Sequence, residues 1–142
     1  MDATIWIATF MATTLMTLFS YMVALLVAQP FKEPFLLAVL LNKFKVTDNT
    51  TNRVIGWILH YVLGLLFVLF FEVLLQMKWL SISWSSALIY GVVIGILGIL
   101  GWKILFHVTN KKPKMNYTGY YTQLFIAHVI FAFTMVACYM YF

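Results

Sequence analysis

Four long apolar runs, separated by short polar segments, organise this chain. They cover about residues 5–28, 54–75, 84–107 and 120–142. Each run is long enough to supply the roughly 20 helical residues that cross a bilayer. The runs are continuously apolar rather than alternating, which favours helices over the strands of a membrane barrel. The pattern therefore predicts an all-α membrane protein, a bundle of four transmembrane helices that forms a single domain over residues 1–142.

A shorter apolar stretch lies in the first polar segment. The sequence "KEPFLLAVLLNKFK" begins its helical part with Glu33-Pro34, a pair typical of a helix start, and stays apolar for about two turns. This stretch, at about residues 34–45, is too short to span. We expect an amphipathic helix that lies at the inner membrane interface in the first cytoplasmic loop, or a shallow re-entrant segment.

Composition and charge add a location and an orientation. Of the 142 residues, 64% are hydrophobic and 9% are charged, whereas about a quarter of the residues in a soluble domain are charged. The net charge is +5. Most Lys and Arg residues lie in the first and third polar segments, whereas the second polar segment carries only Lys78. This asymmetry predicts that the first and third loops are cytoplasmic and both termini outside, in a bacterial inner membrane. Anionic lipid headgroups, rather than nucleic acid, are the expected partners of these loops.

Histidines are the main candidates for chemistry. In "GWILHYVLG", His60 has Gly56 and Gly64 four residues away on either side, so the three share one stripe of a helix. His128 lies at a similar depth in the last run, and His107 closes the third. An ionisable group inside a span is costly and faces the bundle interior or a wet cavity. One interpretation is a haem, quinone or metal site, or a proton relay, at His60 and His128; the other is hydrogen bonding between helices. No Cys, Asp or Glu is positioned to complete a zinc or di-iron set. The sequence therefore indicates no particular metal, and no cofactor is predicted.

The third run carries a small-residue pattern. Gly91, Gly95 and Gly98 in "GVVIGILGILG" form a face on which another helix can approach closely. The partner helix belongs either to the same bundle or to a second subunit, as in a homo-oligomer.

Polar residues inside the other runs allow two further interpretations. Thr9, Thr13, Thr17 and Ser20 form a hydroxyl stripe along one face of the first run. The stripe indicates either hydrogen bonding between helices or a polar conduit. Glu72 is the one carboxylate within a run; it lies near the outer interface, where it pairs with Lys78, reaches the headgroups, or couples transport to protons.

Several of these features occur together in one known group of proteins. The "TTLMT" of residues 13–17, the following Pro30, the Gly56-x-x-x-His60-x-x-x-Gly64 motif, the Gly-rich third run and His128 resemble a group of small uncharacterised bacterial four-helix integral membrane proteins. The resemblance covers most of the chain. It implies the four-helix architecture and singles out His60 and His128, and it implies no activity.

The sequence predicts a function without catalysis. It contains no nucleophile elbow, phosphate-binding loop or paired carboxylates. The leading hypothesis is a non-enzymatic membrane protein that acts through helix–helix contacts, as an accessory subunit or a homo-oligomer. A second is a haem- or quinone-binding electron-transfer bundle that uses His60 and His128. A third is an oligomeric proton-coupled transporter.

Overall fold

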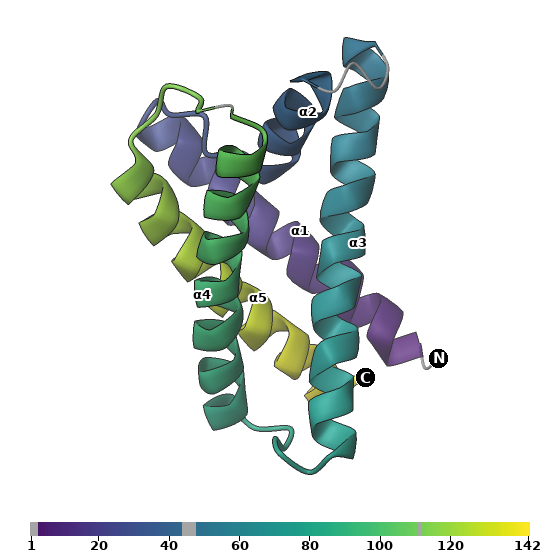
Figure 1. Cartoon of the computed structure of the whole chain (residues 1–142). Coiled ribbons are helices and arrows are strands. Elements are labelled where there is room, and N and C mark those ends of the chain that lie inside the picture. The colour runs from purple at the N-terminus through teal and green to yellow at the C-terminus, as the bar shows by residue number, and fades with distance from the viewer. Residues whose placement is uncertain (1–2, 44–47, 111) are drawn as a thin grey trace.

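The chain folds into five helices, as a computed structural model of residues 3–43, 48–110 and 112–142 shows. In these ranges they are α1 (Ala3–Leu26), α2 (Glu33–Lys43), α3 (Asn49–Gln76), α4 (Trp84–Val108) and α5 (Tyr117–Tyr141). In Figure 1, α3 and α4 are both upright, and α1 and α5 run obliquely behind them. The predicted fold class is confirmed: all-α, with four long apolar helices and a short helix between the first two.

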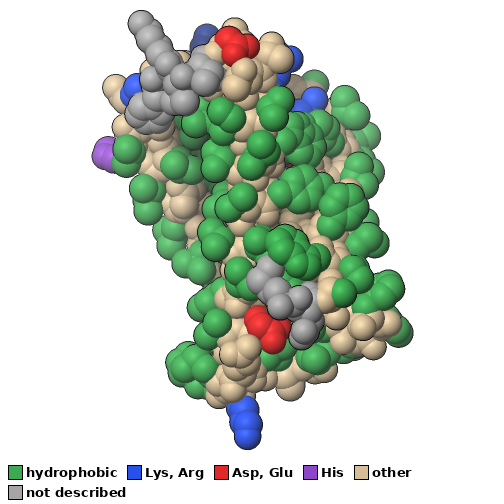
Figure 2. Space-filling model, turned by 90° about the vertical axis from the view of Figure 1, so that its right-hand side faces the viewer, with side chains coloured by type: hydrophobic (Ala, Val, Ile, Leu, Met, Phe, Trp, Pro, Cys, Tyr) green, Lys and Arg blue, Asp and Glu red, His purple; other side chains and the backbone are tan. Residues whose placement is uncertain are grey.

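Four of these helices qualify as membrane spans. α1, α3, α4 and α5 are each long and apolar enough to cross a bilayer. Their flanks carry a nearly continuous apolar surface, as the face in Figure 2 shows. Because such a surface would be unstable in water, the protein is a small helical membrane protein. The orientation of its termini stays a prediction.

Helix starts follow from the polar residues that precede them. The side chain of Asp48 accepts hydrogen bonds from two backbone N–H groups of the first turn of α3. Ser83 does the same for the N–H of Ser86 in α4, and Asn116 for that of Gly119 in α5. These caps satisfy N–H groups that a helix leaves without partners. Hydrogen bonds from the Thr51 hydroxyl, and then from the backbone N–H groups of Thr51 and Thr50, lower the pKa of Asp48, an exposed carboxyl outside the spans.

The helices pack in a chain of pairs rather than all against all. α4 packs on α5, α5 on α1, α1 on α3, and α3 on α2. The glycine face of α4 lies in the first of these contacts. A Cβ atom at Gly91 would lie 3.0 Å from the Cα of Val129, and one at Gly95 would lie 2.8 Å from the ring of Phe125. The helix that approaches this glycine face is therefore α5 of the same chain.

α2 is more than a connection between two spans. More than half of its residues are buried, Leu36 and Ala38 among them. It lies against α3 at Gly56, where a Cβ atom would come within 2.5 Å of the carbonyl oxygen of Pro34. Gly56 is thus the point at which α2 approaches α3, and α2 forms part of the protein core. Whether its remaining surface rests on the inner interface stays a prediction.

The two ends of the bundle differ in charge. One end, which we call the basic end, carries α2 and the α4–α5 loop; the opposite end carries the termini and the α3–α4 loop. The basic end holds Lys32, Lys43, Arg53, Lys112 and Lys114. At the opposite end Lys78 lies in the α3–α4 loop with a left-handed φ of 59°.

A candidate ligand-binding cavity

A cavity of about 310 Å³ lies in the half of the bundle nearer the basic end, and all five helices contribute to its wall. Three titratable side chains line it, Glu33 of α2, His60 of α3 and His128 of α5. The rest of the wall is almost entirely apolar. Its larger apolar side chains include Met16, Leu37, Leu63, Phe67, Trp102 and Leu124.

The cavity reaches the flank of the bundle between α3 and α4. Leu63 of α3 and Leu97 of α4 both line the cavity, and they are also 44% and 47% exposed. Gly101 of α4 lies in the same wall, and a Cβ atom there would meet nothing within 4 Å. Because these residues belong to membrane spans, the exposed side of the cavity faces lipid.

His60 is buried and hydrogen-bonded to α1. Its Nε2 lies 2.9 Å from Oγ1 of Thr17. The Thr17 hydroxyl donates its one hydrogen to the carbonyl oxygen of Thr13, at 2.6 Å. It therefore accepts from His60, whose Nε2 carries the hydrogen. The helix contact that the sequence allowed for His60 is present, and the ring also faces the cavity.

His128 is buried on the other side of the cavity. Its Nδ1 lies 2.8 Å from the carbonyl oxygen of Leu124. A carbonyl oxygen only accepts, so Nδ1 carries the hydrogen. The ring lies against Gly98, where a Cβ atom would be 2.7 Å from its Cε1. It also meets the ring of Phe67 edge-on at 5.7 Å between centroids. Gly98 thus provides the space for an imidazole rather than for a helix backbone.

Glu33 is the cavity residue that sequence reasoning missed. The pattern indicated only a helix start, whereas the side chain is 2% exposed. Its Oε1 accepts from Oγ of Ser20 at 3.0 Å and from Nε2 of Gln123 at 3.2 Å. Oε2 is buried with no hydrogen-bond partner in the described part of the chain. Burial raises the pKa of Glu33 to about 7, against the opposing effect of its hydrogen bonds. A signal was present: the stretch after Glu33 is apolar on every side, which is typical of a buried helix.

The hydroxyl stripe of α1 is buried and largely satisfied by its own helix. Thr9 and Thr17 each donate to the carbonyl oxygen four residues earlier, and Oγ of Ser20 lies 3.1 Å from the carbonyl oxygen of Met16. Thr17 and Ser20 also hydrogen-bond to His60 and Glu33 respectively, across helices. Thr13 lies directly against Gly64 of α3. Thr17 and Ser20 therefore make contacts between helices, whereas Thr9 bonds within α1 and the Thr13 hydroxyl has no hydrogen-bond partner in the described part of the chain. The two glycines beside His60 admit different neighbours: Gly56 admits α2, and Gly64 admits Thr13.

Two predicted site residues lie away from the cavity. His107 is exposed near the end of α4 and lines a separate surface hollow with Lys103, Lys112 and Tyr117. Glu72 lies in the opposite half of the bundle, where its Oε2 accepts a hydrogen bond from the Tyr139 hydroxyl at 2.9 Å. The structure therefore brings His60 and His128 together with Glu33, but not with His107 or Glu72.

Neither a cluster of metal ligands in the described part of the chain nor a known relative assigns a role to this cavity. Within residues 3–43, 48–110 and 112–142, no three His, Cys, Asp or Glu side chains are grouped so as to hold a metal ion. The resemblance to small bacterial four-helix proteins stays a prediction. No family model, curated protein or solved structure matches this chain.

Proposed function

We propose that this protein binds a small lipophilic molecule with a polar aromatic head, of the quinone class, in the cavity between α3 and α4. The observation that carries the proposal is the composition of the cavity wall. It is apolar except for two imidazoles and one carboxyl, which come from three different helices. Ligand sites are typically apolar hollows with a few polar groups that orient the ligand.

Access from the bilayer favours a lipid-soluble ligand. The exposed side of the cavity is bordered by leucines of two membrane spans, so a ligand dissolved in the membrane can enter without crossing water. A quinone combines an isoprenoid tail, which can remain in lipid, with one polar ring that can enter the cavity. The ring then reaches Glu33, His60 and His128.

The cavity fits a single ring better than a porphyrin. Its volume of about 310 Å³ is near the lower end of the roughly 300–1,000 Å³ range of ligand sites. A porphyrin is four pyrrole rings wide. Haem ligation by two histidines also needs a free nitrogen on each ring facing the iron from opposite sides. Nε2 of His60 is already hydrogen-bonded to Thr17, which makes it a poor axial ligand.

The proposal involves binding without catalysis, and an accessory role is a second candidate. Little of the chain lies outside the helices, so an effect on other proteins would act through contacts within the membrane. The face of α4 that contains Gly91 and Gly95 is covered by α5. A partner subunit or a second copy would therefore contact another surface.

Anionic lipid headgroups are the proposed partners of the basic end. Lys32 and Arg53 line a surface hollow together with Tyr21 and Trp57. The Lys32 ammonium lies 5.0 Å above the Tyr21 ring. Cations beside aromatic rings at the interfacial end of a bundle are typical of phospholipid headgroup contacts.

The proposed binding can be tested with a benzoquinone that carries a decyl chain, added to the purified protein in lipid nanodiscs. Trp102 lines the cavity, so its fluorescence should be quenched in a saturable way, and a Trp102→Phe variant should lose most of that signal. Gly101→Leu should abolish binding while the protein stays folded, because the new side chain has open space within the cavity wall. Absence of saturable binding to the folded wild-type protein would contradict the proposal.

A further inference from the structure

The hydrogen positions on the two imidazoles restrict the ligand. On His128, Nδ1 carries a hydrogen that is donated to the carbonyl oxygen of Leu124. A neutral imidazole has only one N–H, and a charged one is costly inside a span. Nε2 of His128 therefore presents a lone pair. This nitrogen is not the one that bonds to Leu124, and its ring lines the cavity.

On His60 the hydrogen is on Nε2 rather than on Nδ1, so this ring also keeps one nitrogen with a lone pair. The Thr17 hydroxyl donates to Thr13 and can only accept from Nε2 of His60. The neutral ring is left with a lone pair on Nδ1, and the ring lines the cavity. Both imidazoles at the cavity are therefore hydrogen-bond acceptors.

Glu33 supplies the third group. Its Oε1 receives hydrogens from Ser20 and Gln123, so a proton on this carboxyl would reside on Oε2. Oε2 is the oxygen that has no partner in the described part of the chain. Because burial raises the pKa of Glu33 to about 7, a substantial fraction of the molecules carries that proton at neutral pH.

We infer that the cavity selects the reduced, hydroxyl-bearing member of the quinone class, a quinol, over the oxidised quinone; this rests on the function proposed above. A quinol has two phenolic O–H donors that can pair with the lone pairs of His60 and His128. The carbonyl oxygens of a quinone only accept, so they would leave the lone pairs of both imidazoles without a hydrogen; the Glu33 carboxyl, when protonated, is the one of these three groups that could donate to them. A buried polar group without a partner weakens binding.

The test compares two oxidation states of one molecule. Affinities of the wild-type protein for a decyl-benzoquinol and for the corresponding quinone are measured in nanodiscs, with oxygen excluded for the quinol. We expect the quinol to bind at least about tenfold more tightly, the effect of one net hydrogen bond. His128→Phe keeps a ring of similar size and removes the acceptor. It should weaken quinol binding about tenfold and leave quinone binding nearly unchanged, whereas His107→Phe, outside the cavity, should change neither.

A second measurement needs no substitution. Nitrogen-15 spectra of histidine-labelled wild-type protein distinguish the two neutral forms of each imidazole. We expect the hydrogen on Nδ1 of His128 and on Nε2 of His60, with the Nε2 signal of His128 shifting when the quinol is added. The opposite assignments would overturn the inference.

These measurements separate failure of quinol selection from failure of the proposed binding function. Equal affinity for the two forms, or tighter binding of the quinone, would overturn the selection of quinol while leaving the proposed binding function intact. Binding of neither form by folded wild-type protein would overturn the proposed function and, with it, this inference.

Discussion

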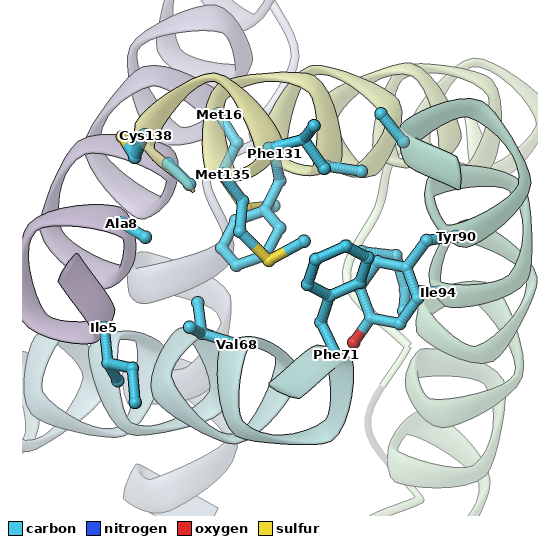
Figure 3. Packing of buried hydrophobic residues seen from close by; sticks show 14 of the residues in the cluster. Ile5, Ala8, Met16, Val68, Phe71, Tyr90, Ile94, Phe131, Met135 and Cys138 are labelled. Carbon is cyan, nitrogen blue, oxygen red and sulfur yellow. The ribbon is translucent and has the colours of Figure 1, made fainter. Parts of the chain in front are cut away.

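The two halves of this bundle are built from similar apolar helices but are filled differently. In the half near the α3–α4 loop, large side chains of α3, α4 and α5 form one buried cluster; Figure 3 shows Phe71, Tyr90 and Met135 pointing into it. In the half near the basic end, the same helices surround a cavity with two imidazoles and a carboxyl. The first half is thus filled by core side chains, whereas the second combines a smaller buried cluster with room for a ligand.

The difference arises from what lies between α3 and α4. In the filled half, Tyr90 of α4 donates a hydrogen bond to the carbonyl oxygen of Phe67 of α3, and its ring packs on Phe71 at 5.0 Å between centroids. In the other half α3 packs on α2 instead. The wall of α4 there contains Gly98, which lies against the His128 ring, and Gly101, where a Cβ atom would meet open space.

The buried cluster near the α3–α4 loop predicts that its large side chains contribute strongly to stability. Phe131 is fully buried, and Phe131→Ala should lower the free energy of unfolding by about 4 kcal/mol, because its contacts are lost and a void remains. Unfolding in mixed micelles with increasing denaturing detergent measures this. A loss below about 1 kcal/mol would contradict dense packing there.

In the cavity half, stability should depend on pH through Glu33. Its pKa rises from 4.5 unfolded to about 7 folded, so the folded state holds a proton that the unfolded state releases between these values. The stabilisation is fully present below pH 4.5 and is lost as the pH rises to about 7; it amounts to roughly 3 kcal/mol at 1.36 kcal/mol per pH unit. Glu33→Gln keeps an oxygen for Ser20 and Gln123 but does not titrate. The difference between wild-type and variant unfolding free energies, measured from pH 4 to 8, isolates this contribution from that of other groups. A flat difference would contradict it.

Two alanine substitutions in one helix should have opposite signs. Gly101→Ala should raise the free energy of unfolding by up to about 1 kcal/mol, because alanine favours a helix and the new methyl group meets open space. Gly95→Ala should lower it by a similar amount, because the methyl group would lie 2.8 Å from the Phe125 ring. The same unfolding assay measures both. Stabilisation by both variants would show that α4 does not contact α5 closely at Gly95.

Glu72→Gln should have the smallest effect. The amide oxygen can still accept the hydrogen bond of the Tyr139 hydroxyl, so we expect a change below about 0.5 kcal/mol. Because Glu72 is not part of the cavity wall, ligand affinity should stay the same. A loss of ligand affinity would link the two halves of the bundle and contradict their separation.

Sequence reasoning located the helices well and the cavity only in part. The apolar runs predicted four spans and a short helix because the length of an apolar segment is a local property. The Gly-x-x-x-His-x-x-x-Gly motif indicated an imidazole facing the bundle interior, because glycines one turn away leave space beside it. Glu33 was missed because its burial depends on Ser20 and Gln123, which lie 13 and 90 residues away in the chain.

The sequence by itself therefore determined that lipid surrounds the protein, how many helices it has, and which residues can carry a charge inside the membrane. Apolar length, helix caps and the scarcity of charge decide these without long-range contacts. Only the tertiary structure decided that His60, His128 and Glu33 share one cavity while His107 and Glu72 do not, and that α5 covers Gly91 and Gly95. The physical reason is that these outcomes depend on how helices cross, and crossing is set by side chains that meet from distant parts of the chain.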